Sequence, residues 1–90
     1  MNSQLPDWLY HVTVPRMSKV DKLIARMRNN PQGWDIETLK GLAERYGITH
    51  RQYGTSHVVF RRTDGKAISV PAHRPIKPVY IRAFLTLLEE

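Results

Sequence analysis

Residues 57–70 read HVVFRRTDGKAISV, two apolar stretches separated by the polar turn Thr63-Asp64-Gly65. This pattern is typical of a β-hairpin. A two-residue Asp64-Gly65 loop would divide the apolar side chains between the two faces of the hairpin. A three-residue loop, with Gly65 in the left-handed conformation, gathers four of them on one face. They then form two cross-strand pairs, Phe60–Ile68 and Val58–Val70. We therefore predict the three-residue loop, between strands at 57–62 and 66–70.

The same register turns the remaining hairpin side chains away from the core, because side chains alternate along a strand. His57 is then the first residue of a strand and lies on an outer face with Arg61. The outer face also carries Val59, Ala67 and Ser69. The small polar turn Gly54-Thr55-Ser56 directly precedes His57.

Two helices are predicted before the hairpin. Ser18, with Asp21 three residues later, resembles a capping box, and the stripe that follows is Val20, Leu23, Ile24 and Met27. Asp35 begins the second helix and Gly47 ends it. The apolar face of that helix consists of Ile36, Leu39, Ala43 and Tyr46, with Leu42 beside it.

A short, polar edge strand is expected at 48–53, and a last helix is expected from Pro78 onward. Its stripe is Ile81, Phe84, Leu85 and Leu88. Residues 71–78 contain three prolines and are predicted to be irregular. The chain is thus predicted to be α+β, a three-stranded antiparallel sheet with helices on one face and an extra N-terminal helix. One domain is expected at 18–90, preceded by an N-terminal arm at 1–17.

Positive charge is concentrated in one part of the chain. The net charge is +6, and residues 51–82 carry seven Lys or Arg against Asp64 alone. A patch of this kind usually binds nucleic acid through its phosphates, although it can also be a solvated face that keeps a small domain soluble. The chain has no cysteine. It also shows no signal-peptide pattern and no apolar run long enough to span a bilayer, so we expect a cytoplasmic protein without a membrane partner.

Three segments together resemble the HicA family of bacterial toxin–antitoxin modules. They are Gly54-Thr55-Ser56-His57 with the strand after it, Asp64-Gly65-Lys66 with residues 68–73, and Lys77-Pro78-Val79-Tyr80-Ile81-Arg82. The resemblance implies the α-β-β-β-α arrangement of a double-stranded RNA-binding domain. It also implies an mRNA interferase, an endonuclease that blocks translation and is neutralised by a HicB-type antitoxin. The family's catalytic histidine corresponds to His57. Thr55 departs from the pattern, because many members have glycine directly before the serine.

RNA carries its own nucleophile, the 2′-hydroxyl, so one histidine can act as base or acid in its cleavage without a metal. We assign that role to His57. Arg61 is expected to hold the phosphate, with Arg62 or Lys66 as further candidates. The backbone amides of the preceding turn can also face the phosphate. These belong to Gly54, Thr55 and Ser56.

The remaining candidates are open between two interpretations. His73 is either a second acid–base group or a loop histidine hydrogen-bonded to backbone. Arg74 and Lys77 contact either RNA phosphate or acidic residues of a partner. Tyr53 either stacks on a base or packs in the core or at an edge. The four histidines lack zinc-site spacing, so neither a metal nor another cofactor is expected.

The main prediction is a metal-independent nuclease acting on single-stranded mRNA, with a HicB-type antitoxin as its protein partner. The alternative is an RNA-binding module of the same fold that does not cut. A third interpretation is an interaction protein whose outer sheet face, around Val59 and Ala67, pairs with a partner.

Overall fold

The computed structural model describes residues 18–54 and 56–89, so the predicted arm at 1–17 lies outside the described residues. The described residues form an α+β unit with a three-stranded antiparallel sheet, as predicted. The strand order is β1-β2-β3. The elements are α2 (Lys19–Asn29), α3 (Ile36–Arg45), β1 (Thr49–Tyr53), β2 (His57–Arg61), β3 (Ala67–Pro71) and α4 (Pro78–Glu89). No helix in this part of the chain has the length and apolar character needed to cross a membrane.

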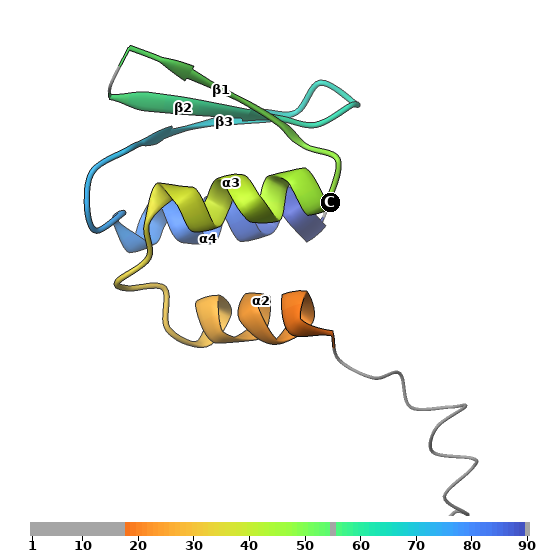
Figure 1. Cartoon of the computed structure of the whole chain (residues 1–90), viewed down its shortest axis with the longest axis vertical. Helices are drawn as coiled ribbons and strands as arrows, with labels where there is room; N and C mark the ends of the chain where they lie inside the picture. Colours follow the sequence, from red (N-terminus) through yellow and green to blue (C-terminus); the bar gives the residue numbers. More distant parts are fainter. Residues whose placement is uncertain (1–17, 55, 90) are drawn as a thin grey trace, which may run out of the picture.

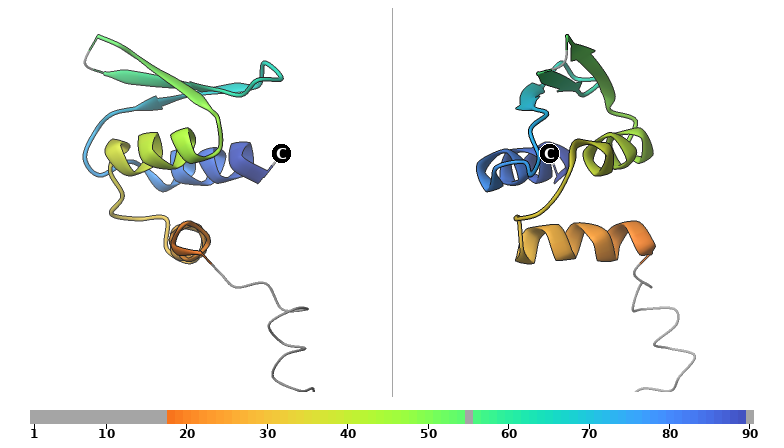
Figure 2. Two further views of the ribbon diagram at one scale, coloured as in Figure 1. Left: turned by 45° about the vertical axis from the view of Figure 1, so that its right-hand side comes forward. Right: turned by 60° about the vertical axis from the view of Figure 1, so that its left-hand side comes forward.

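The elements are stacked in three layers (Figures 1 and 2). The sheet is one layer, and α3 and α4 lie side by side against one of its faces. Helix α2 lies beyond them, on the side away from the sheet, and packs on α4. The helices are therefore all on one side of the sheet, but the extra helix covers α3 and α4 rather than the sheet itself. The described residues leave the opposite face of the sheet uncovered.

The hairpin between β2 and β3 has the predicted three-residue loop. Phe60 lies opposite Ile68 and Val58 lies opposite Val70. The amide of Arg62 donates to the carbonyl of Lys66 at 2.8 Å, which closes the loop. Gly65 has a φ of +96°, in the left-handed region that favours glycine. Strands β2 and β3 each begin and end within one residue of their predicted limits.

The core lies between the sheet and the two helices beneath it. Phe60 and Phe84 are fully buried and meet edge to face, with their ring centroids 5.0 Å apart. Val58 and Val70 are also fully buried, whereas Ile68 is half-buried. The predicted apolar face of the hairpin is confirmed.

The helix ends follow the predicted caps. Ser18 and Asp21 form a complete capping box. Asp35 accepts a hydrogen bond from the amide of Thr38 at 3.0 Å. Gly47, which follows the cap residue Tyr46 at the end of α3, has a φ of +69°. These local signals confirm the predicted start of α2 and the predicted start and end of α3.

Predicted core residues of all three helices are corrected. In α2, Val20 and Leu23 are only half-buried. Tyr46 is 44% exposed, because α3 ends at Arg45 and Tyr46 is the cap residue, whose side chain leaves the helical stripe. In α4, Leu87 is buried while Leu88 is only half-buried. Helix α4 is in the middle layer, between the sheet and α2, so its buried sector is wider than a single stripe.

The loop between β3 and α4 is irregular, as its prolines predict. Ile76 is nevertheless buried, and its amide donates to the carbonyl of Trp34 at 3.0 Å. The Arg74–Pro75 peptide bond is cis. The hydrogen bond between Ile76 and Trp34 holds the loop against the segment that leads into α3.

Replacing Phe60 by alanine is expected to lower the free energy of unfolding by about 3–5 kcal/mol, because it removes a fully buried ring from the core. Urea denaturation measures the change. Ser69→Ala, at an exposed position of the same sheet, is the control and should change stability by no more than about 0.5 kcal/mol. Equal effects of the two substitutions would contradict the packing described here.

Asp35→Ala is expected to lower the free energy of unfolding by about 1 kcal/mol, because it removes the cap of α3, whereas Asp35→Asn keeps a capping side chain.

The pKa of Asp35 is lowered from its ordinary value of 3.8, first by the hydrogen bond from the amide of Thr38, then by the one from its hydroxyl, and also by the nearby charge of Arg74. The ionised carboxylate therefore stabilises the fold above pH 3.8, and this contribution is lost as the pH falls through the lowered pKa. Denaturation of the parent and of the Asp35→Ala variant, at neutral and at acid pH, measures the contribution of this carboxylate to the free energy of unfolding. A stability difference that did not narrow in acid would contradict the assignment.

Candidate active site

His57 lies at the start of the central strand, where the turn after β1 leads into β2. Its side chain is exposed, and its Nδ1 atom is 3.1 Å from Oγ of Ser56. Gly54 has a φ of +63°, which allows the tight turn, and Thr55 lies outside the described residues. As predicted, His57 belongs to the outer face of the sheet.

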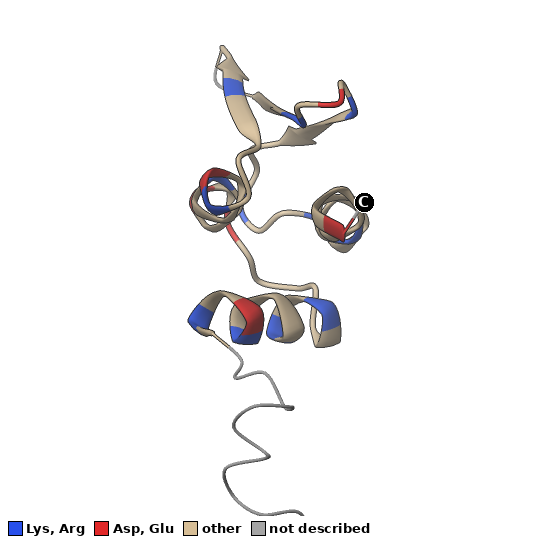
Figure 3. Cartoon of the chain, turned by 90° about the vertical axis from the view of Figure 1, so that its right-hand side faces the viewer, with Lys and Arg blue, Asp and Glu red and all other residues tan. Residues whose placement is uncertain are grey.

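The outer face is built from three rows of side chains that cross the strands. Residues opposite each other in neighbouring strands share a face. The rows are Tyr53–His57–Pro71, Arg51–Val59–Ser69 and Thr49–Arg61–Ala67. None of the three strands contains an acidic residue. Figure 3 shows the acidic residues of the described chain on the helices, in the loop before α3 and in the hairpin turn.

The predicted phosphate-binding residues of the hairpin lie far from His57. Arg61 shares its face but is four residues along the strand, about 13 Å away between Cα atoms. The guanidinium of Arg62 donates to the carbonyl of Leu87 at 3.1 Å and pairs with Asp64 at 2.9 Å. Arg62 therefore fastens the hairpin to the end of α4. Lys66 follows the hairpin turn and borders a hollow on the helix side, with residues of α4.

A second group of predicted residues lies at the same end of the molecule as His57. The amide of Ala72 donates to the carbonyl of Ser56 at 2.8 Å, which holds the start of the loop after β3 beside the turn before β2. That loop carries His73, Arg74 and Lys77, all exposed. Figure 1 shows the loop at the end of the sheet where β1 turns into β2. The predicted residues thus divide between the two ends of the sheet, and His57 belongs with the loop residues.

Two further residues lie beside His57: Tyr53, which the sequence left open between base stacking and packing, and Arg51, which was not predicted to act there. Tyr53 lies directly opposite His57 and is 56% exposed, which excludes a place in the core. The guanidinium carbon of Arg51 is 6.0 Å from the centre of the Tyr53 ring. The signal for Tyr53 was present in the sequence, because a three-residue turn at 54–56 places residues 53 and 57 opposite each other.

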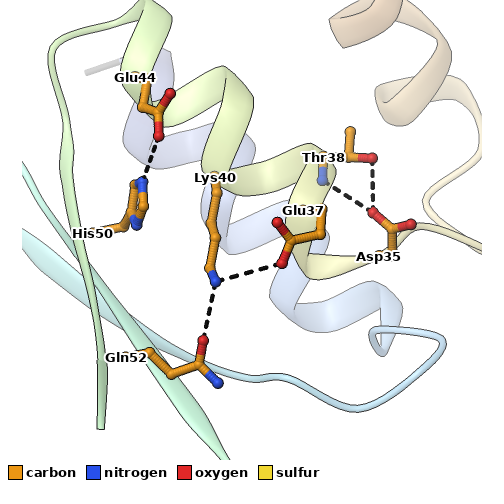
Figure 4. Close-up of polar contacts among 7 residues, drawn as sticks. All are labelled: Asp35, Glu37, Thr38, Lys40, Glu44, His50 and Gln52. Atoms are coloured by element: carbon orange, nitrogen blue, oxygen red, sulfur yellow. Dashed lines mark hydrogen bonds and ion pairs between the residues drawn. The ribbon is translucent and has the colours of Figure 1, made fainter. Parts of the chain in front are cut away.

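The inner face of β1 explains why Arg51 and Tyr53 point outward. His50 approaches Glu44, with Nε2 2.8 Å from Oε2, and Gln52 accepts a hydrogen bond from Lys40 at 3.0 Å (Figure 4). Lys40 also pairs with Glu37. Polar contacts to α3 therefore hold the even-numbered residues of β1 against the helix, and alternation sends the odd-numbered residues to the open face.

No cluster of three or more His, Asp or Glu side chains able to hold a metal ion occurs within residues 18–54 and 56–89. Searches with the chain against protein-family models, curated proteins and solved structures found no match. The family resemblance therefore depends on the motifs in the sequence.

Arg62→Ala is expected to lower the free energy of unfolding by about 1–3 kcal/mol, because it removes a largely buried guanidinium with two partners. Arg61→Ala, its exposed neighbour, should change stability by no more than about 0.5 kcal/mol. Urea denaturation of both variants measures the difference. If Arg62→Ala were as stable as Arg61→Ala, the anchoring role of Arg62 would be wrong.

Proposed function

We propose that this chain is a metal-independent RNA endonuclease in which His57 is the acid–base residue. The observation that carries the proposal is an exposed histidine on an uncovered sheet face that has cations and no carboxylate. A phosphodiester is an anion, so a face without acidic side chains favours its approach. The strand and the turn before it hold the histidine at the edge of this face.

The chemistry uses the nucleophile of the substrate. His57 takes the proton from a 2′-hydroxyl, whose oxygen attacks the adjacent phosphorus. The bond from phosphorus to the 5′-oxygen breaks, and that oxygen takes up a proton from water or from His73. The products are a 2′,3′-cyclic phosphate and a 5′-hydroxyl. In this proposal the backbone amides of Gly54 and Ser56, with the cations of the loop, offset the growing negative charge.

We further propose that the nuclease is the toxin of a HicA-type module, acting on mRNA and neutralised by a HicB-type antitoxin in the cytoplasm. The three sequence segments support this, together with the order α3-β1-β2-β3-α4, which agrees with a double-stranded RNA-binding-like arrangement. An antitoxin bound to the outer face of the sheet would block His57. Helix α2 is additional to this arrangement.

The test is RNA cleavage by the purified chain in excess chelator, with long single-stranded RNA. His57→Ala is expected to reduce the rate by about 10²–10⁴-fold, the usual contribution of general acid–base catalysis. Tyr46→Ala is the control, since Tyr46 is an exposed residue at the end of α3, away from the open face. It should retain the activity of the parent. Cleavage that survives His57→Ala would refute the assignment.

Two further measurements separate the competing functions. RNA with 2′-O-methyl groups should bind and remain intact, because it lacks the nucleophile. Expression of the chain in bacteria should arrest growth, and His57→Ala should abolish the arrest. Binding without cleavage by the parent chain would instead favour the RNA-binding module.

A further inference from the structure

We infer that the outer sheet face beside His57 binds one unpaired strand of RNA, with a base stacked on Tyr53 and the neighbouring phosphate held by Arg51. This inference rests on the proposed function and specifies its substrate site. It differs from the predicted assignment, which placed phosphate binding on the hairpin residues Arg61, Arg62 and Lys66.

The position of Tyr53 is the first argument. Residues directly opposite each other in antiparallel strands have Cα atoms about 4.5–5.5 Å apart, so Tyr53 is the nearest cross-strand neighbour of His57 on β1. The ring is 56% exposed, and it lies on the outer face of an edge strand, where no described element covers it. An exposed aromatic ring accepts any base, because every base has a flat π face. A base stacked there would place its own phosphate close to His57.

Arg51 is the second argument. It occupies the next row of the face, about 7 Å along the strand from Tyr53, and its guanidinium lies 6.0 Å from the ring centre. A guanidinium in this position can stack beside a base and contact a phosphate at the same time. No ion pair between Arg51 and a carboxylate occurs among the described residues.

The shape of the face is the third argument. A shallow hollow of about 400 Å³ runs along β1 and β2, and it is lined by Thr49, His50, Arg51, Tyr53, Val59 and Arg61. The outer residues of β3 beside it are small, Ala67 and Ser69, so they leave the approach from that side open. Arg61 provides a second cation at the far end. The hollow thus follows a line from Tyr53 to Arg61 that suits an extended strand.

The chemistry of the face favours RNA over a protein partner. Apart from Tyr53, its apolar side chains are Ala67 and the half-buried Val59 and Pro71, which is too small an apolar area for the core of a protein interface. Its charged groups are cations alone. A single strand fits better than a duplex, because a base must be unstacked to present its face to an aromatic ring.

The experiment is fluorescence anisotropy with a labelled, single-stranded 2′-O-methyl RNA and the full chain. This RNA cannot be cut by the proposed mechanism, so binding is measured independently of catalysis. Tyr53→Ala is expected to weaken binding by about 5- to 150-fold, while Tyr53→Phe keeps the stacking ring and should bind as the parent does. Tyr46→Ala removes an exposed tyrosine at the end of α3, away from the open face, and should leave binding unchanged.

The salt dependence distinguishes the two contacts. Arg51→Ala should reduce the slope of log affinity against log salt by about 0.7, the value for one phosphate contact on a single strand. Tyr53→Ala should weaken binding and leave that slope unchanged.

The proposal is overturned if Tyr53→Ala binds as tightly as Tyr46→Ala, a result that would leave the face to a protein partner. It is also overturned if duplex RNA binds as tightly as the single strand and if Tyr53→Ala changes neither affinity. Cleavage that persists in His57→Ala would refute the proposed catalysis while leaving the Tyr53 result intact. The two failures are therefore distinguishable.

Discussion

The contact between Phe60 and Phe84 is the interaction on which the rest of the structure depends. It joins the central strand to the last helix, and it requires Phe60 to face inward. Since side chains alternate along a strand, this requirement sends His57 to the open face. A slip of one residue in the hairpin would bury His57 and Arg61 and expose the core. The register that completes the core therefore also positions the candidate catalytic residue.

Strand β1 is held in a different way. Its inward side chains, His50 and Gln52, are polar and contact charged residues of α3. The sheet is thus apolar beneath β2 and polar beneath β1. Both kinds of contact have the same consequence for the open face, because each determines which side chains point away from the helices. Arg51 and Tyr53 are available beside His57 because their neighbours in the chain bind to α3.

The positive charge of the chain has two structural uses. At the hairpin end, Arg62 holds the loop to α4 and to Asp64, so this charge contributes to the fold. At the other end, the loop after β3 carries exposed cations beside the turn that leads to His57. A count of charges along the sequence cannot separate these uses, since both groups belong to the same basic stretch. The loop cations lie beside His57, whereas Arg62 is held away from it by Leu87 and Asp64.

The sequence by itself determined the elements, their caps and the register of the hairpin, because capping, turn chemistry and side-chain alternation act between residues close in the chain. It also placed His57 on an outer face. The tertiary structure decided what depends on contacts between distant segments. These are the third layer formed by α2, the exposure of Tyr46, the anchoring of Arg62 on Leu87, and the face of β1 that turns toward α3. The turn at 54–56 already places Tyr53 opposite His57, whereas the contacts of His50 and Gln52 with α3, which leave Arg51 beside Tyr53 on the open face, join separate elements of the fold.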